Sequence, residues 1–365
     1  MLQVGIVGLP NVGKSTLFKT LTKKQVDCAN FPFCTIEPNV GIVEVPDERL
    51  RQLTIASKSE KTIPAAIEFV DIAGIVEGAH KGEGLGNKFL ANIREVDMIL
   101  HVVRGFSDPN VVHVSGKVDP ARDVEVIEME LAFADMDTAQ KRLDAVRGKM
   151  KAGRTKELEA EESALSKFMA ALEQGRLTNA IELSEEEEVA VKGLPLLTRK
   201  PMLYVVNVDE NFFKATLVAS GRDGTKVPLN IGERLAIPVS VKIESEIVDM
   251  APEDQTTFLA ELGLSQSGLD RVIRKCYELL DLITYFTSGE KESRAWTIAK
   301  GTKAPQAAGV IHTDFEKNFI RAEVIDWKDF VELGESGCRD AGKLRVEGKE
   351  YVMRDGDTCH FRVNV

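Results

Sequence analysis

The residues with the clearest chemical signature are the nine from Gly8 to Thr16, which read Gly-Leu-Pro-Asn-Val-Gly-Lys-Ser-Thr. In the pattern G-x-x-x-x-G-K-[ST], the glycines let backbone N–H groups close around phosphate oxygens. Lys14 is expected to reach the β- and γ-phosphates and to act in catalysis, and Ser15 is expected to ligate Mg²⁺. The motif predicts a nucleoside triphosphate site, whose other contacts we expect from Asn11, Val12, Gly13 and Thr16.

The elements on either side of this motif favour the same interpretation. Residues 2–7 form a short apolar run of strand length, and residues 16–21 carry apolar side chains at helical spacing. A phosphate loop lies between a strand and a helix, because the helix N-terminus adds partial positive charge next to the phosphates. The alternative is an ordinary glycine turn between strand and helix.

A second motif supplies a carboxylate for Mg²⁺. The tetrapeptide Asp71-Ile72-Ala73-Gly74 follows a strand predicted over residues 65–70. The Asp71 carboxylate can hold the hydration shell of Mg²⁺, and the Gly74 N–H can face the γ-phosphate. Thr35 lies in the loop between the two motifs, where switch GTPases place a threonine that completes the Mg²⁺ coordination. A D-x-x-G tetrapeptide that arises by chance is the alternative.

The segment Asn207-Val208-Asp209-Glu210 stands where GTPases carry the base-reading motif N-K-x-D. Guanine offers two neighbouring donors, N1–H and the 2-amino group, which a correctly placed aspartate accepts together. Glu210 is one methylene longer than aspartate, and Val208 replaces the lysine, so guanine loses most of its advantage over adenine. We predict an ATP site read by Asn207, Val208 and Glu210, with Asp209 as an alternative reader.

The chain lacks the glutamine that orients the attacking water in many GTPases. Ile75 stands directly after Gly74, and no glutamine follows before residue 86. Hydrolysis must then use another group, a monovalent cation or a partner. His80 is our candidate for orienting water, with a solvated loop residue as the alternative, and Asn11 is our candidate ligand for K⁺. We expect slow intrinsic turnover.

The remaining pattern predicts a doubly wound α/β sheet of the P-loop NTPase (G-domain) type. Further strands are predicted over 40–45, 97–103, 201–206 and 235–241, and an amphipathic helix over 269–280. From Leu282 the chain changes to β-rich alternation with Gly and Asp turns. We expect one domain over 1–280, a helical insertion within it at 124–198, and a small separate domain over 281–365.

The insertion reads as an antiparallel helical hairpin. Apolar residues at three- and four-residue spacing run from Met129 to Met150 and again from Leu158 to Leu172, with Glu161 as an acidic interruption. This seam predicts a coiled coil, with two ordinary core helices as the alternative. A helix is also predicted to open at Ser184, where four glutamates suit the helix dipole.

A cluster of cations surrounds the predicted turn of the hairpin. Residues 141–156 contain Lys141, Arg142, Arg147, Lys149, Lys151, Arg154 and Lys156, against the single acid Asp144. We name Lys149, Lys151 and Arg154 the basic tip. It is our candidate for contacting RNA phosphates, and such contacts weaken steeply with salt. The alternative is a solvated helical surface.

The composition excludes several classes of protein. The 365-residue chain has 43% hydrophobic and 29% charged residues, typical of a globular protein. Its net charge of −11 argues against a protein that coats DNA or other nucleic acid over its whole surface. No apolar run approaches the roughly 18 residues of a membrane span. Five cysteines without a C-x-x-C pair are typical of reduced thiols in a cytoplasmic protein.

On these motifs the sequence resembles the Obg-like ATPase (YchF) family of translation-factor-class P-loop proteins. The resemblance covers essentially the whole chain and is carried by residues 8–16, 30–41, 71–87, 207–210 and 309–317. It implies a G domain, an inserted coiled-coil hairpin and a C-terminal TGS domain of β-grasp type. It also implies ATPase activity, dependence on Mg²⁺ and K⁺, and association with ribosomes. Cys34 departs from the threonine that many relatives carry there.

The function predicted from the sequence is a cytoplasmic ATPase that switches between nucleotide states and regulates translation or the stress response at the ribosome. A conventional GTPase is one alternative. A P-loop kinase or metabolic ATPase, with a substrate in the cleft beside the hairpin, is another. The switch is favoured because the sequence has a switch threonine and a D-x-x-G, but no identifiable lid arginine cluster.

Overall fold

The computed structural model describes residues 2–23, 39–73, 85–113, 116–213, 231–232 and 234–364. Thr35, Gly74, Ile75 and His80 lie outside the described residues. The chain divides into two compact units. The first unit contains the chain up to Lys23, a short segment that ends at Gly41, and Phe69–Leu269. The second unit contains Ile42–Glu68 and the chain from Asp270 onward. The domain boundaries expected from the sequence stay predictions.

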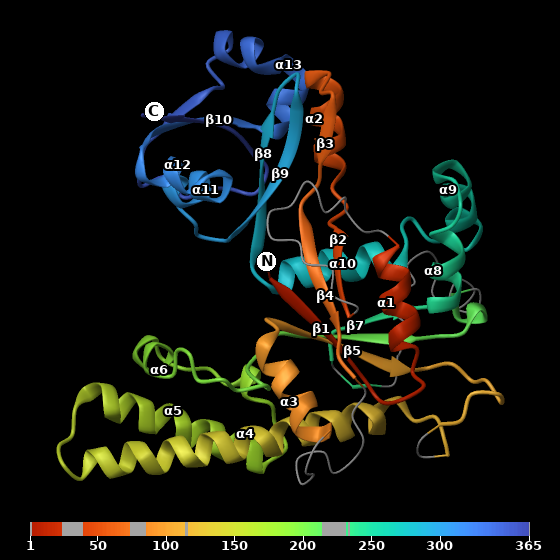
Figure 1. The fold of residues 1–365 in the computed structure, drawn as a ribbon, viewed down its shortest axis with the longest axis vertical. Helices are drawn as coiled ribbons and strands as arrows, with labels where there is room; N and C mark the ends of the chain where they lie inside the picture. Colours follow the sequence, from red (N-terminus) through yellow and green to blue (C-terminus); the bar gives the residue numbers. More distant parts are fainter. Residues whose placement is uncertain are drawn as a thin grey trace. The chain divides into compact units, whose positions relative to one another are not determined.

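The first sheet has six strands in the order β2-β4-β1-β5-β6-β7 (Figure 1). Their bounds are β1 Gln3–Val7, β2 Val40–Glu44, β4 Ala66–Asp71, β5 Met98–Arg104, β6 Met202–Asn207 and β7 Ala236–Val239. The pairs β1–β5, β5–β6 and β6–β7 are parallel. Every residue of β5 and β6 is buried, as their continuous apolar runs predict. The predicted α/β sheet is confirmed.

The last predicted strand of this sheet is shorter than expected. It was predicted over 235–241, but β7 ends at Val239 and helix α8 begins at Val241. Ser240 and Val241 are each 2% exposed, so the buried run continues into the first turn of α8, a helix that also carries the exposed Lys242. The other helices of this unit outside the insertion are α1 Lys14–Thr22, α3 Leu85–Glu95, α9 Pro252–Glu261 and the start of α10 Gly268–Leu279.

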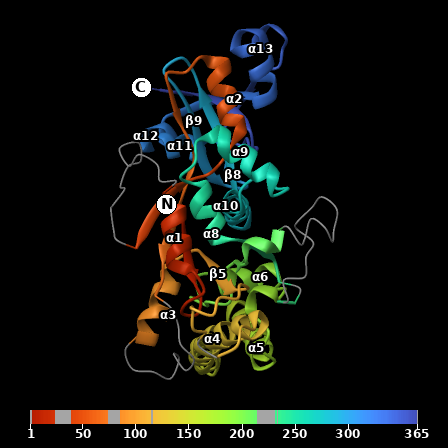
Figure 2. The same cartoon turned by 90° about the vertical axis from the view of Figure 1, so that its right-hand side faces the viewer.

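Helices α4 (Pro120–Met150) and α5 (Lys156–Glu173) lie side by side as the predicted hairpin (Figures 1 and 2). Their shared core contains Ala139, Leu143, Val146, Leu165 and Phe168. Glu161, the acidic residue within the predicted apolar seam, forms an ion pair with Arg142 of the other helix, which explains why it is tolerated there. The seam does not extend to Met129, which is 53% exposed, since the buried apolar face of that part of α4 includes Val124, Ile127 and Leu131 instead.

Two short helices complete the insertion, η3 (Thr178–Ala180) and α6 (Glu185–Ala190). Helix α6 opens directly after Ser184, as predicted. The Ser184 hydroxyl accepts from the backbone N–H of Glu187, whose carboxylate accepts from the backbone N–H of Ser184. This reciprocal capping box satisfies two backbone donors at the helix start. None of the described helices is long and apolar enough to cross a membrane.

The second unit contains a mixed sheet in the order β11-β10-β12-β8-β9-β3 (Figure 1). Its strands are β3 Lys61–Ile63, β8 Leu282–Ser288, β9 Glu292–Ala299, β10 Phe319–Asp326, β11 Arg345–Glu347 and β12 Asp357–Val363. Its helices are α2 Glu48–Ser57, most of α10, α11 Ala304–Ile311, α12 Thr313–Lys317 and α13 Trp327–Asp340.

The strands β9-β8-β12-β10-β11 form a β-grasp arrangement. The β12–β8 pair is parallel, whereas β8–β9, β10–β12 and β10–β11 are antiparallel. Residues of α11 pack on one face of this sheet, where the core contains Tyr285, Ala307, Ala308, Val324 and Phe361. The β-rich C-terminal pattern is thereby explained, and the specific TGS assignment stays a prediction.

Candidate nucleotide-binding site

The loop between β1 and α1 has a backbone that few residue types can adopt. Gly13 has φ 101° and Asn11 has φ 62°, both in the left-handed region. A Cβ atom at Gly13 would also lie only 2.5 Å from Nδ2 of Asn207. Gly13 is the N-cap of α1, so the free N–H groups of the first helical turn lie directly after it. This geometry suits the binding of an anion at the helix N-terminus.

Lys14, Ser15 and Asp71 form a polar cluster at this loop. The Ser15 hydroxyl lies 3.2 Å from Oδ2 of Asp71, to which it donates, and the Lys14 ammonium donates to the Leu9 carbonyl at 3.3 Å. Burial lowers the pKa of Lys14, and the Asp71 carboxylate opposes that shift. Burial raises the pKa of Asp71, against the effects of the Ser15 hydrogen bond and the Lys14 charge.

The same cluster fits a magnesium ion. Mg²⁺ is usually held by one or two protein oxygens together with substrate phosphates, not by a cage of side chains. The Ser15 hydroxyl and the Asp71 carboxylate are two such hard oxygen donors at hydrogen-bond distance. Within the described ranges no group of three or more His, Cys, Asp or Glu side chains is arranged to hold a metal.

A cavity of about 530 Å³ opens beside the loop. Its walls come from the segments that follow β5, β6 and β7, together with Asn11, Gly13 and Thr16. Parallel strands present their carboxyl ends at one edge of the sheet, and ligands of open α/β sheets bind outside that edge. The cavity has the position expected for the nucleoside part of a bound triphosphate.

Asn207 connects three segments around this cavity. Its Nδ2 donates to the Val12 carbonyl at 3.0 Å, and its Oδ1 accepts from the Val241 N–H at 3.1 Å. The residue is 7% exposed, and its neighbour Val208 is 4% exposed. Both ends of the Asn207 amide are therefore used to hold the phosphate loop, the end of β6 and the start of α8 together.

Both carboxylates of the predicted base-reading motif have partners within the protein. Glu210 forms an ion pair with Lys242, and Oδ2 of Asp209 accepts from the Ser107 N–H at 3.2 Å. The two acids thus face different walls of the cavity, Glu210 toward the segment after β7 and Asp209 toward the segment after β5.

Two of these walls were missed from the sequence. Ser240, Val241 and Lys242 follow β7, and residues 106–111 follow β5. Arg104 is 2% exposed and supports the second wall by donating to the Phe106 carbonyl at 3.2 Å and the Asp108 carbonyl at 3.3 Å. Two features of the sequence could have indicated these walls. Arg104 ends an apolar strand, and the Ser-x-Lys at 240–242 follows the last strand of the sheet.

The basic tip lies at the end of the hairpin, where Lys149, Lys151 and Arg154 are all exposed. Three of the other cations near it form ion pairs: Lys141 with Asp137, Arg142 with Glu161, and Arg147 with Glu162. Within the part of the chain that the structure describes, no ion pair involves the three residues of the basic tip.

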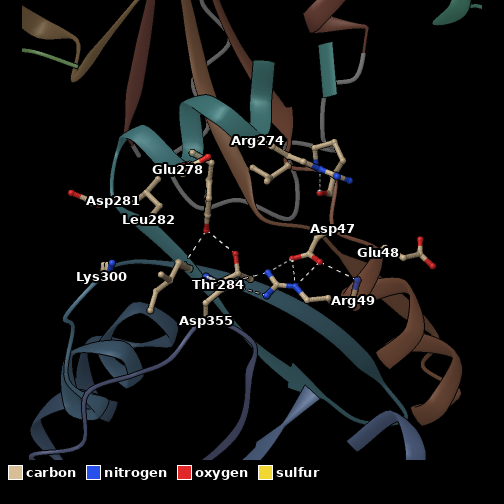
Figure 3. Close-up of a pocket in the computed structure, with 14 residues that line it drawn as sticks. Asp47, Glu48, Arg49, Arg274, Glu278, Asp281, Leu282, Thr284, Lys300 and Asp355 are labelled. Atoms are coloured by element: carbon tan, nitrogen blue, oxygen red, sulfur yellow. Dashed lines mark hydrogen bonds and ion pairs between the residues drawn. The ribbon is translucent and has the colours of Figure 1, made fainter. Parts of the chain in front are cut away.

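A second cavity, of about 650 Å³, lies in the second unit between residues 45–49, α10 and the start of β8. There Arg49 donates to Asp47 and to Asp355 at 2.7 Å each, and Asp355 also accepts from the Thr284 N–H at 2.9 Å (Figure 3). These charges satisfy one another, and no residue predicted from the sequence to act lines this cavity.

Known protein families match parts of both units of the chain. Residues 3–141 match a family model described as "50S ribosome-binding GTPase", and residues 282–364 match one described as "Protein of unknown function (DUF933)". The chain is 53% identical to the "Ribosome-binding ATPase YchF" of Bacillus subtilis, with all of both chains covered. It is 51% identical to the protein of the same name from Escherichia coli O157:H7, with 99% of each covered.

A solved structure, titled as the Schizosaccharomyces pombe YchF GTPase, matches with a TM-score of 0.85 and 40% identity. The match covers 99% of this chain and 97% of that one. Similarity of this extent in both sequence and fold leaves one assignment for a chain with a phosphate loop, a helical hairpin and a β-grasp unit: it belongs to the YchF family of P-loop proteins.

Proposed function

We propose that this protein is an ATPase that binds and slowly hydrolyses ATP and that associates with ribosomes in the cytoplasm. The observation that carries the proposal is the cluster of Lys14, Ser15 and Asp71 at a left-handed glycine loop. Full-length relatives named ribosome-binding ATPases support both the nucleotide and the partner. The nucleotide state is proposed to control ribosome association and, through it, translation or the stress response.

Mg²⁺ is the proposed cofactor, as is typical of P-loop GTPase-family proteins. Ser15 and Asp71 would hold it, with Thr35 as a further proposed ligand. When bound, the ion supplies positive charge that stabilises the charge developing on the transferred phosphoryl group. We also propose K⁺ at Asn11, whose amide is oriented by donating to the Val112 carbonyl at 3.2 Å.

Among this chain's own residues, Lys14 is proposed to bind the β- and γ-phosphates and to stabilise their charge. Asn11, Val12, Gly13 and Thr16 are proposed to surround the phosphates, and Gly74 to face the γ-phosphate. Asn207, Val208 and Glu210 are proposed to form the base site. His80 is our proposal for the group that orients water.

A GTPase is the second candidate. The Schizosaccharomyces pombe relative is titled a GTPase, and Asp209 lies directly beside Glu210 in the base cavity. A titration of the purified protein with labelled ATP and GTP separates the two candidates. Tighter binding of GTP than of ATP would contradict the ATPase proposal.

The test of the phosphate site is Lys14→Ala, with phosphate release and ATP binding as the measurements. Loss of the charged donor from this buried position should lower ATP affinity by about ten- to a hundredfold. Lys19→Ala, on the exposed side of the same helix, is the matched control and should bind ATP normally. Retained ATP affinity in Lys14→Ala would remove the assignment. Transfer of phosphate to a small molecule instead of water would favour a kinase.

A further inference from the structure

We propose that Lys242 is a specificity-determining residue, which favours ATP over GTP by holding the Glu210 carboxylate away from the base. The inference rests on the proposed function, because it concerns the base site of the same nucleotide cavity. Both residues line that cavity, and they form an ion pair across it.

The backbone beneath Lys242 is anchored. Ser240 and Val241 are each 2% exposed, and the Val241 N–H donates to Oδ1 of Asn207 at 3.1 Å. The position of Lys242 is therefore tied to the residue that also holds the phosphate loop. Its side chain is 72% exposed and that of Glu210 is 48% exposed, so the pair lies where a base can approach it.

The chemistry of the two bases makes this pair selective. A free carboxylate at Glu210 would accept from guanine N1–H and the guanine 2-amino group, and it would repel the N1 acceptor of adenine. Pairing with an ammonium occupies the carboxylate and offsets its charge. The ammonium itself offers only donors, which suit the N1 acceptor of adenine and oppose the N1–H of guanine.

Glu210 is the acid on which selectivity depends. The partner of Asp209 is the backbone N–H of Ser107 at 3.2 Å, which a side-chain substitution does not remove. The partner of Glu210 is a side chain and can be removed by mutation. The hydrogen bond from Lys242 to Glu210 also raises the pKa of Lys242, so the lysine is charged at neutral pH.

The expected effect is modest, because exposed ion pairs in water are weak. An interaction of this class corresponds to a change of up to about fivefold in an equilibrium constant. We therefore expect Lys242→Ala to shift the ratio of ATP to GTP affinity toward GTP by up to about fivefold. Lys242→Arg should keep a ratio close to that of the original protein, because it retains the positive charge.

The experiment measures the dissociation constants of labelled ATP and GTP for the full-length protein with Mg²⁺. The variants are Lys242→Ala, Lys242→Arg and the double variant Lys242→Ala/Glu210→Gln. Lys303→Ala is the matched control, because Lys303 forms an exposed pair with Glu350 and lines neither the nucleotide cavity nor the loop. Its ratio should not change.

The proposal predicts that the gain in GTP binding disappears in the double variant, because glutamine brings no charged acceptor to guanine. An unchanged ratio in Lys242→Ala, or an equal gain with Glu210→Gln present, would overturn it. These outcomes differ from failure of the proposed function, which would show as a preference for GTP over ATP in the unsubstituted protein.

Discussion

At the scale of single residues, Asn207 and Gly13 determine how the nucleotide site is assembled. The Asn207 amide lies so close to Gly13 that any Cβ there would lie 2.5 Å from Nδ2. The same amide satisfies the Val12 carbonyl and the Val241 N–H. A residue expected to read the base thus also serves as the internal support of the phosphate loop.

Asn207→Ala should impair nucleotide binding more than a lost surface contact would. It leaves the Val12 carbonyl and the Val241 N–H without their partner in a buried region, at a cost of about 1–3 kcal/mol for each group. We expect ATP affinity to fall at least about tenfold, measured by calorimetric titration with Mg²⁺. Asn179→Ala, which removes an exposed amide that donates to the Lys200 carbonyl, is the control. ATP affinity equal to that of the unsubstituted protein would contradict this role.

At the scale of elements, the hairpin combines a structural and a proposed binding role. Arg147 and Lys149 lie in the last turn of α4, and Glu157 and Glu159 in the first turn of α5, so their charges complement both helix dipoles. Arg147 is also tied to Glu162 across the hairpin. Lys151 and Arg154 lie between the two helices, and none of the ion pairs among the described residues uses them or Lys149, which supports the assignment of the three as a contact for phosphates.

Reversing the basic tip to glutamate at Lys149, Lys151 and Arg154 should weaken ribosome co-sedimentation. Three fewer phosphate contacts should also lower the slope of log affinity against log salt by roughly 2. The measurement is co-sedimentation over a series of KCl concentrations. Reversal of three exposed lysines of the second unit, Lys291, Lys317 and Lys349, changes the net charge equally and is the control. If both variants lost ribosome binding equally, the loss would be due to net charge and not to the position of the basic tip.

At the scale of the whole molecule, the division into two compact units has a thermodynamic consequence. The phosphate loop and the proposed base cavity lie in the first unit, whereas the β-grasp sheet lies in the second. A ligand stabilises the folded state that binds it, so in a chain whose units unfold independently only the binding unit gains stability.

Saturating ATP with Mg²⁺ should therefore raise the unfolding temperature of one part of the protein and leave the other unchanged. At a free ligand concentration of one hundred times Kd, the added stability is about 2.7 kcal/mol. Scanning calorimetry, with hydrogen exchange to assign each transition, measures it. Lys14→Ala should show the same transitions without the ATP-dependent shift. A single transition that shifts as a whole would contradict independent units.

The prediction of the fold was most accurate where the sequence signal was local. The apolar runs of β5 and β6 and the core of the hairpin followed from spacing, and the start of α6 at Ser184 followed from its acidic first turn. Errors arose where tertiary packing changed the pattern. The run through Val241 was assigned to one strand although it enters α8, and Met129 was assigned to a seam although the hairpin core begins further along α4.

The sequence by itself determined the phosphate site, because its glycines, lysine and hydroxyl group lie within nine residues and form one strand–loop–helix unit. It also indicated Asp71 as the carboxylate beside that site, 56 residues away from Ser15. Only the tertiary structure decided the partners of the two acids in the predicted base-reading motif. Ser107 and Asp209 are 102 residues apart, and they meet because parallel strands bring their carboxyl ends to one edge of the sheet. Lys242 reaches Glu210 for the same reason, since β6 and β7 are neighbours in the sheet.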